Sequence, residues 1–231
     1  MKTIGMLGGM SWESTASYYK LINEGVRERL GGLHSAKICM YSVDFEEIEK
    51  LQHRGNWGAA GKILSDAAGG IQAGGADFLI ICTNTMHKVA SQIEEAVSIP
   101  ILHIADATAE ELIARGVQCV GLLGTSFTMQ QEFYKGRIAE KYGIEVLVPS
   151  DEQQQVVHDI IYSELCRGTV RDTSREYYLQ IIRVLSRQGV EAIVLGCTEI
   201  GLLVQQQHTS IPLYDTTSIH ANRAVEMALS D

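Results

Sequence analysis

The sequence predicts an α/β protein built from two similar domains, each with its own parallel sheet. Short apolar runs alternate with longer segments of helical periodicity along the 231 residues. The apolar runs are rich in β-branched residues and nearly continuous, as is typical of strands buried on both faces of a parallel sheet. A weak internal repeat also relates the two halves of the chain. We therefore expect domains related by a pseudo-two-fold axis, with the functional site in the cleft between them.

Strands and helices are expected to alternate, which is the arrangement that gives βαβ units. The predicted strands cover residues 2–8, 36–43, 77–83, 100–104, 118–124, 144–148, 191–197 and 211–215. The predicted helices cover residues 12–29, 57–73, 85–97, 106–115, 128–142, 151–166, 172–188 and 217–229. No low-complexity segment or long flexible linker separates these elements.

The repeat rests on short matches that occur in the same order at a nearly constant offset. Residues 4–9 resemble residues 120–125, and residues 75–84 resemble residues 189–198, at offsets of 116 and 114. A period of this length indicates duplicated domains rather than a solenoid. Near the end of the chain, Ile211-Pro212 mirrors Ile99-Pro100, so we expect the tail to return to the first half. The predicted domains are residues 1–104 plus 211–231, and residues 105–210.

The composition excludes several classes of partner. Lys and Arg number 19 against 28 Asp and Glu, a formal net charge of −9, whereas a nucleic-acid binder needs a basic face. No apolar run approaches the roughly 20 residues that cross a bilayer, and no polybasic stretch suits a membrane surface. The five cysteines form no CxxC pair, which favours free thiols in a reducing cytoplasm. We expect a cytoplasmic protein with a small-molecule ligand.

The loops that follow four of the predicted strands carry small, hydroxyl or thiol side chains. They are Gly8-Gly9-Met10-Ser11, Cys82-Thr83-Asn84-Thr85-Met86-His87, Gly124-Thr125-Ser126-Phe127-Thr128 and Gly196-Cys197-Thr198-Glu199. Ligands gather at the carboxyl ends of parallel strands, and helix N-termini hold carboxylates without Lys or Arg. Ser, Thr and Asn are also the preferred helix caps. Four such loops at duplicated positions favour an anion cradle over capping alone.

Cys197 is the candidate reactive thiol, because it directly follows an apolar strand and precedes a polar turn. A helix N-terminus there is expected to lower the pKa of the thiol. The offset of 114 makes Thr83 the counterpart of Cys197 and makes Cys82 the counterpart of Gly196. Since side chains alternate along a strand, Cys82 should point away from the direction of Thr83. The other cysteines are interpreted as structural: Cys39, Cys119 and Cys166.

Several familiar sites are missing from the sequence. There is no GxxxxGK[ST] phosphate loop, no GxGxxG dinucleotide loop and no GxSxG elbow. The seven histidines form neither HExxH nor a Cys/His cluster, so no metal site is predicted. His87 lies four residues after Thr83 and is interpreted as a cap, with assistance to proton transfer as the alternative.

The loop motifs resemble those of the cofactor-independent aspartate/glutamate racemase superfamily, and most closely its enterobacterial amino-acid racemases. The resemblance covers essentially the whole chain and is carried by residues 6–12, 83–87, 123–128 and 195–200. It implies two facing α/β domains, a homodimer, and no pyridoxal phosphate or metal. It also implies two opposed cysteines that remove and return an α-proton.

The chain departs from this pattern in the first motif, where Thr83 stands at the position of the family's cysteine. The resemblance then implies Cys197 as thiolate base on one face of the α-carbon and Thr83 on the other. The α-carboxylate is expected against Asn84, Thr85 and the loop from Thr125 to Thr128. The full set of expected substrate-binding residues is Met10, Gln52, Asn84, Thr85, Thr125, Thr128, Thr198 and Glu199.

The preferred substrate and the reaction class stay open at the level of sequence. L-aspartate or L-glutamate is the first expectation, and candidates for its distal carboxylate are Gln52, Arg54, Lys88 and Arg167. Without an obvious arginine for that group, a racemase acting on a broader range of polar amino acids is the alternative. A related decarboxylase or cis–trans isomerase is a third interpretation. A non-catalytic amino-acid binding module is the alternative from a different class.

Overall fold

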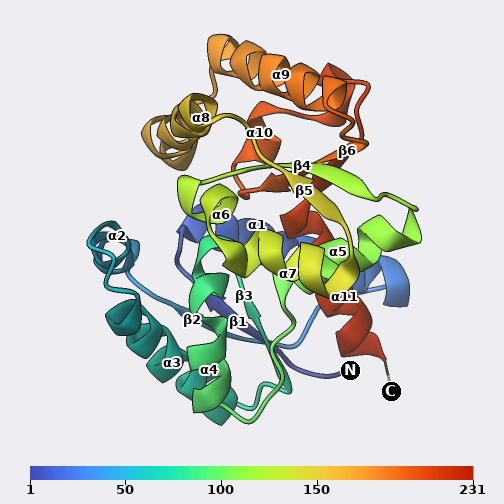
Figure 1. Ribbon diagram of the computed structural model, residues 1–231. Helices are drawn as coiled ribbons and strands as arrows, with labels where there is room; N and C mark the ends of the chain where they lie inside the picture. Colours follow the sequence, from blue (N-terminus) through green and yellow to red (C-terminus); the bar gives the residue numbers. More distant parts are fainter. Residues whose placement is uncertain (231) are drawn as a thin grey trace. The chain divides into compact units, whose positions relative to one another are not determined.

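The computed structural model describes residues 1–230 and divides into two compact units (Figure 1). The first unit comprises Met1–Ile104 together with the chain from His220 onward, and the second comprises Ala105–Ile219. Each unit contains one parallel sheet with helices packed against it. The predicted fold class, two parallel-sheet α/β domains, is therefore confirmed.

The first unit is organised around a three-stranded sheet of order β2-β1-β3, in which all strands are parallel. Its elements are β1 (Ile4–Gly8), α1 (Trp12–Leu30), β2 (Ile38–Ser42), α2 (Phe45–His53), α3 (Trp57–Ala73), β3 (Phe78–Ile81), the 3-10 helix η1 (Thr85–Val89) and α4 (Ala90–Ala96). The last helix, α11 (Thr216–Leu229), starts just before the chain re-enters this unit.

Alternation along the strands gives this sheet two buried faces. Leu7, Leu79 and Ile81 point to one face, where they pack with apolar residues of α2, α3 and α4. Ile80 and Cys82 point to the other face, where the core is completed by α1 and α11. Both faces are apolar because helices cover both, as parallel sheets require.

The second unit has a four-stranded parallel sheet of order β5-β4-β6-β7. Its elements are α5 (Ile104–Ala114), β4 (Cys119–Gly124), α6 (Ser126–Gln130), α7 (Glu132–Tyr142), β5 (Glu145–Leu147), α8 (Asp151–Ser163), η2 (Leu165–Arg167), α9 (Asp172–Arg187), β6 (Ala192–Gly196), α10 (Ile200–Leu203), η3 (Gln206–His208) and β7 (Leu213–Asp215). A capping box at Ser150 starts α8, as expected for a serine followed three residues later by glutamine.

The order β5-β4-β6 in the second sheet matches the order β2-β1-β3 in the first, and the strand registers reproduce the offset seen in the sequence. Leu7 of β1 pairs with Ile81 of β3, and Leu123 of β4 pairs with Leu195 of β6. Ile81 and Leu195 are 114 positions apart, the offset of the second sequence match. The residues two positions beyond them therefore follow equivalent strand ends.

Several elements differ from the sequence prediction, and α10 and η3 lie outside all the predicted helices. The predicted helix 128–142 is broken at Gln131, whose extended backbone ends α6 before α7 begins, and the predicted helix 85–97 is divided into η1 and α4. The predicted strand 100–104 forms only an isolated bridge between Leu79 and Ile101. Helix α2 was not predicted, because its nine residues, with apolar side chains at Phe45, Ile48 and Leu51, are shorter than the window of about 11 residues over which helical periodicity is recognised.

The return of the chain to the first unit also differs from the expected boundary. Strand β7 pairs with β6, and the N–H of Ile193 donates to Pro212 O at 2.8 Å, so residues 211–219 lie with the second sheet. The first unit resumes at His220 rather than at residue 211. Asp231, the last residue of the predicted domain, lies outside the described residues. Within residues 1–230, every helix is too short or too polar to span a membrane.

Candidate active site

Cys197 lies directly after β6, at the carboxyl end of the second sheet. Its side chain is half-buried, and its Sγ donates a hydrogen bond to Oε2 of Glu199 at 3.0 Å. Glu199 is only 7% exposed, so its carboxylate meets the thiol in a largely dry environment. The pair joins an ionisable sulfur to an acceptor for its proton.

The electrostatics of this pair differ from the expectation of an activated thiolate. Burial, and then the charge of Glu199, raise the pKa of the Cys197 thiol well above its ordinary value. The expected lowering by a helix N-terminus is wrong, because α10 has only four residues and therefore little dipole. In this state the sulfur carries its proton.

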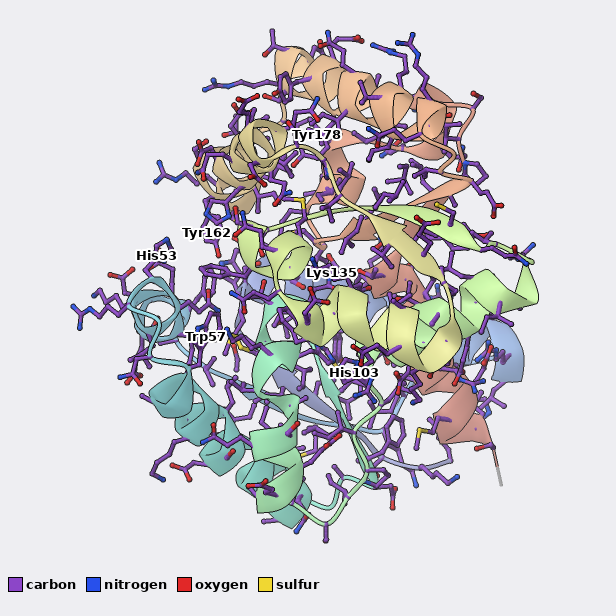
Figure 2. The ribbon with its side chains drawn as sticks, viewed as in Figure 1. His53, Trp57, His103, Lys135, Tyr162 and Tyr178 are labelled. Atoms are coloured by element: carbon purple, nitrogen blue, oxygen red, sulfur yellow. The ribbon has the colours of Figure 1, made fainter. Side chains whose placement is uncertain are left out.

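A buried tyrosine lies behind the thiol in the same unit. The hydroxyl of Tyr178, labelled in Figure 2, donates to Val157 O at 3.2 Å. Burial raises the pKa of this phenol well above its usual value, and Cys197 adds to the shift only when its thiol is ionised. Tyr178 is therefore neutral and adds no charge beside the sulfur.

The Thr125 hydroxyl caps helix α6 beside the end of β6, and it contacts the Thr128 hydroxyl inside that helix. Their Oγ1 atoms are 3.2 Å apart, and Thr125 Oγ1 accepts from the N–H of Thr128 at 3.3 Å. The neighbouring N–H of Ser126 donates to His158 Nδ1 at 3.2 Å. A Cβ added to Gly196 would lie 3.4 Å from Thr128 Cγ2, so the two loops touch. The capping role of Thr125 is therefore observed, and two N–H groups of the expected anion cradle, those of Ser126 and Thr128, already have acceptors.

Thr83 occupies the equivalent position in the first unit, two residues beyond the end of β3. Its side chain is half-buried, and its carbonyl oxygen accepts from His87 Nδ1 at 2.8 Å. Asn84 and Thr85, the next two residues, are 3% and 7% exposed and lead into η1. The loop is thus short, largely buried and held by a side chain from its own helical turn.

Cys82 belongs to the core of the first unit. It is fully buried among Ile4, Met6 and Tyr18, on the sheet face covered by α1 and α11. Burial raises the pKa of its thiol far above the ordinary value. Cys82 is therefore an inert, structural thiol, as its register one position before Thr83 predicts.

Gln52 and Met10 are also buried in the first unit. Gln52 ends α2 at 3% exposure, and its Nε2 donates to Met86 Sδ at 2.8 Å. Its Oε1 has no hydrogen-bond partner among the residues that the structure describes, which is an unfavourable state for a buried acceptor. The Met10 side chain packs into the apolar core with Met86, so it presents no free side-chain group to a ligand.

The cationic residues considered for the distal carboxylate of the substrate are exposed or half-buried in the structure. Arg54 and Arg167 are exposed. Lys88 is half-buried, with its ammonium 4.2 Å from the ring centroid of Trp57, labelled in Figure 2. Burial lowers the pKa of Lys88. Across residues 1–230, no group of three or more His, Cys, Asp and Glu side chains is arranged to hold a metal ion.

Comparison with known proteins assigns the family. The family model described as Asp/Glu/Hydantoin racemase matches residues 7–224. The chain belongs to the Asp/Glu/hydantoin racemase family. A crystal structure from Yersinia pestis is 54% identical over the whole of both chains, with a TM-score of 0.94. The crystal structure of an aspartate racemase homologue from Pyrococcus horikoshii OT3 has a TM-score of 0.87 against this chain, and the two sequences are 35% identical over the whole of both chains.

A more distant relative carries a name for its activity. The broad specificity amino-acid racemase RacX of Bacillus subtilis (strain 168) is 24% identical over 240 residues, covering 98% of each chain. Members of this family are racemases, so the chain is an isomerase. The residues expected to act are gathered within each unit: Thr83, Asn84, Thr85 and Gln52 with Met10 in the first, and Thr125, Thr128, Cys197, Thr198 and Glu199 in the second.

Sequence reasoning missed one group of polar residues beneath the Thr83 loop. His103 and His220 are 4% and 0% exposed, and their rings lie 4.5 Å and 5.9 Å from that of His87. The three histidines are far apart in the sequence and match no motif, so only the folded chain reveals that they adjoin.

Proposed function

We propose that this racemase inverts the α-carbon of L-aspartate or L-glutamate without pyridoxal phosphate or metal. Cys197 acts as the base on one face of the α-carbon, and Thr83 acts on the opposite face. One observation carries the proposal. Thr83 and Cys197 follow equivalent strand ends of two matching sheets, and Cys197 already donates to a carboxylate 3.0 Å away.

The first proton transfer in this mechanism occurs within the Cys197–Glu199 pair. Glu199 takes the thiol proton, and the resulting thiolate removes the α-proton of the L-amino acid, which regenerates the thiol. A substrate ammonium group closer to the sulfur than to Glu199 would favour this transfer, because it would stabilise the thiolate more than it stabilises the carboxylate. Protonated Glu199 then releases its proton to water.

The second transfer completes the inversion from the other face. The Thr83 hydroxyl delivers a proton to the α-carbon and recovers one from water, since its alkoxide does not persist near neutral pH. The negative charge that develops on the substrate carboxylate needs hydrogen-bond donors, and Asn84 and Thr85 are the proposed donors. Each tenfold gain in rate requires about 1.4 kcal/mol of such stabilisation.

An asymmetric pair of this kind has a measurable signature. The equilibrium constant for racemisation is one, so kcat/KM is the same in both directions. Exchange without inversion is free to differ, because the thiol returns protons more readily than the hydroxyl. In deuterium oxide, the L-enantiomer should exchange its α-hydrogen faster than it racemises. Equal exchange and inversion rates from both enantiomers would contradict the assignment of Thr83.

A broad-specificity racemase for polar amino acids is the second candidate, and Gln52 is the observation that favours it. The buried Gln52 amide can exchange hydrogen bonds with a polar side chain, and its Oε1 has none among the described residues. A neutral amide discriminates less strongly for a carboxylate than an arginine does. Deuterium incorporation measured across a panel of L-amino acids separates the two candidates.

We further propose a cytoplasmic homodimer. The edge strand β2 exposes Met40 and Tyr41, each 49% accessible, on a strand that pairs on one side only. Light scattering during size-exclusion chromatography tests the dimer, and a mass of one chain at micromolar concentration would count against it.

A further inference from the structure

The three histidines beneath the Thr83 loop form a continuous buried group, which we call the histidine column: His87, His103 and His220. All three are at most 4% exposed. The ring of His87 lies between the other two, and Tyr18 continues the column at 5.6 Å from His220. Buried imidazoles in contact require hydrogen-bond partners for their nitrogens, so the partners indicate what the column does.

The column coincides with both points at which the chain passes between the units. The chain leaves the first unit after Ile104 and re-enters it at His220. His103 immediately precedes the outgoing point, and His220 is the first residue after the return. His87 contacts both rings from η1, the turn that begins two residues after Thr83.

The bonds of His87 fix its protonation. Its Nδ1 lies 2.8 Å from Thr83 O, and its Nε2 accepts from the N–H of Ile104 at 3.2 Å. Because a carbonyl only accepts and an amide N–H only donates, the ring is neutral and carries its proton on Nδ1. Both ring nitrogens are engaged by the backbone, so His87 does not relay protons.

His220 holds the same outgoing segment with the opposite tautomer. Its Nε2 donates to Leu102 O at 2.8 Å, and its Nδ1 accepts from the Tyr18 hydroxyl at 2.9 Å. The segment from Leu102 to Ile104 is therefore hydrogen-bonded to one histidine at each end, His220 at Leu102 and His87 at Ile104. Burial lowers the pKa of both rings, to about 4 for His220, so both stay uncharged near neutral pH.

We propose that His87 is a positioning residue of the racemase, tying the backbone of Thr83 to the segment through which the chain leaves the first unit. The inference rests on the proposed role of Thr83 in the reaction. A single side chain joins the loop that carries the Thr83 hydroxyl to residues 102–104, which are themselves fixed to α11 and α1 through His220. The link acts on one face of the substrate only, because Cys197 belongs to the other unit and is not bonded to the column.

Two substitutions each keep one of the two hydrogen bonds of His87 and remove the other. In His87→Asn, the side-chain amide lies near the position of Nδ1, so it keeps a donor for Thr83 O and loses the bond to Ile104. In His87→Gln, the amide reaches the position of Nε2, so it keeps an acceptor for Ile104 and loses the bond to Thr83. His34→Asn and His34→Gln, at an exposed histidine, are the matched controls.

The experiment measures α-hydrogen exchange and inversion of L-aspartate and L-glutamate in deuterium oxide for the full chain and its variants. His87→Gln should lower inversion about tenfold, the effect of one lost buried hydrogen bond, and leave L-exchange within about threefold of wild type. His87→Asn should restore most of the inversion. Equal losses of exchange and inversion in His87→Gln, or no loss of either, would overturn the positioning role.

Two further measurements do not depend on the reaction. Nitrogen-15 NMR of the wild-type rings should show the Nδ1–H tautomer for His87. Amide exchange at Ile104 should quicken in His87→Asn and not in His87→Gln. An Nε2–H tautomer would overturn the proposal directly. If the tautomer and the amide exchange are as expected but the wild-type chain shows no α-hydrogen exchange with either substrate, the proposed function is refuted instead, and with it any role for His87 in the reaction.

Discussion

His220 should make the stability of the first unit strongly dependent on pH. Burial lowers its pKa from 6.5 to about 4, so the unfolded chain binds this proton before the folded one does. The corresponding stability is fully present above pH 6.5 and is lost as the pH falls to about 4. At about 1.4 kcal/mol per pH unit, the loss from His220 alone is about 3 kcal/mol.

The perturbation that isolates this contribution is His220→Gln, which removes the titrating ring and keeps a donor for Leu102 O. Urea unfolding at pH 7 and pH 4 should show a loss of stability about 3 kcal/mol smaller in the variant than in wild type. Tryptophan fluorescence reports the relevant unit, because both tryptophans, Trp12 and Trp57, lie within it. The exposed His34→Gln should lose as much as wild type. An unchanged loss in His220→Gln would refute the reasoning.

The remaining predictions concern the two thiols and the two catalytic faces. Cys197→Ala should reduce α-hydrogen exchange at least about 100-fold, whereas Cys82→Ala should keep most of it; the reverse ranking, seen by proton NMR in deuterium oxide, would show that the register is wrong. Burial and then the charge of Glu199 raise the pKa of Cys197, and Glu199→Gln removes the second of these causes. Iodoacetamide should therefore alkylate this thiol faster in the variant, while α-hydrogen exchange slows for lack of the proton acceptor; slower alkylation would contradict the role of the Cys197–Glu199 pair. Thr83→Cys should bring the inversion rate of the L-enantiomer up towards its exchange rate, and an unchanged ratio of the two rates would count against Thr83.

The duplicated architecture was predictable because it depends on local sequence patterns. Buried parallel strands give apolar runs, and several of the runs here recur at a nearly constant offset. The equivalence of Thr83 and Cys197 followed from that offset, and the strand registers agree with it. Alternation along β3 likewise indicated that Cys82 faces the core.

What the sequence did not predict depends on tertiary contacts. The direction of the Cys197 pKa shift depends on how deeply the fold buries the sulfur and on the approach of Glu199, and neither follows from spacing. The final strand was assigned to the first domain because an Ile-Pro pair recurs, but β7 pairs with β6 instead. The histidine column forms only when three separate segments of the chain come together, so no local sequence pattern predicts these ring contacts.

The return of the chain at His220 bears on how the protein is made. The outer layer over Ile4 and Met6 is supplied partly by α11, through Ala221, Val225 and other small residues close to the C-terminus. During synthesis, the first hundred residues therefore emerge with one side of their sheet covered by α1 alone, until residues 220–229 have been translated. A nascent chain arrested before Thr216 should stay open to proteases in its N-terminal portion, whereas the second unit already has all four strands of its sheet, the last of which ends at Asp215.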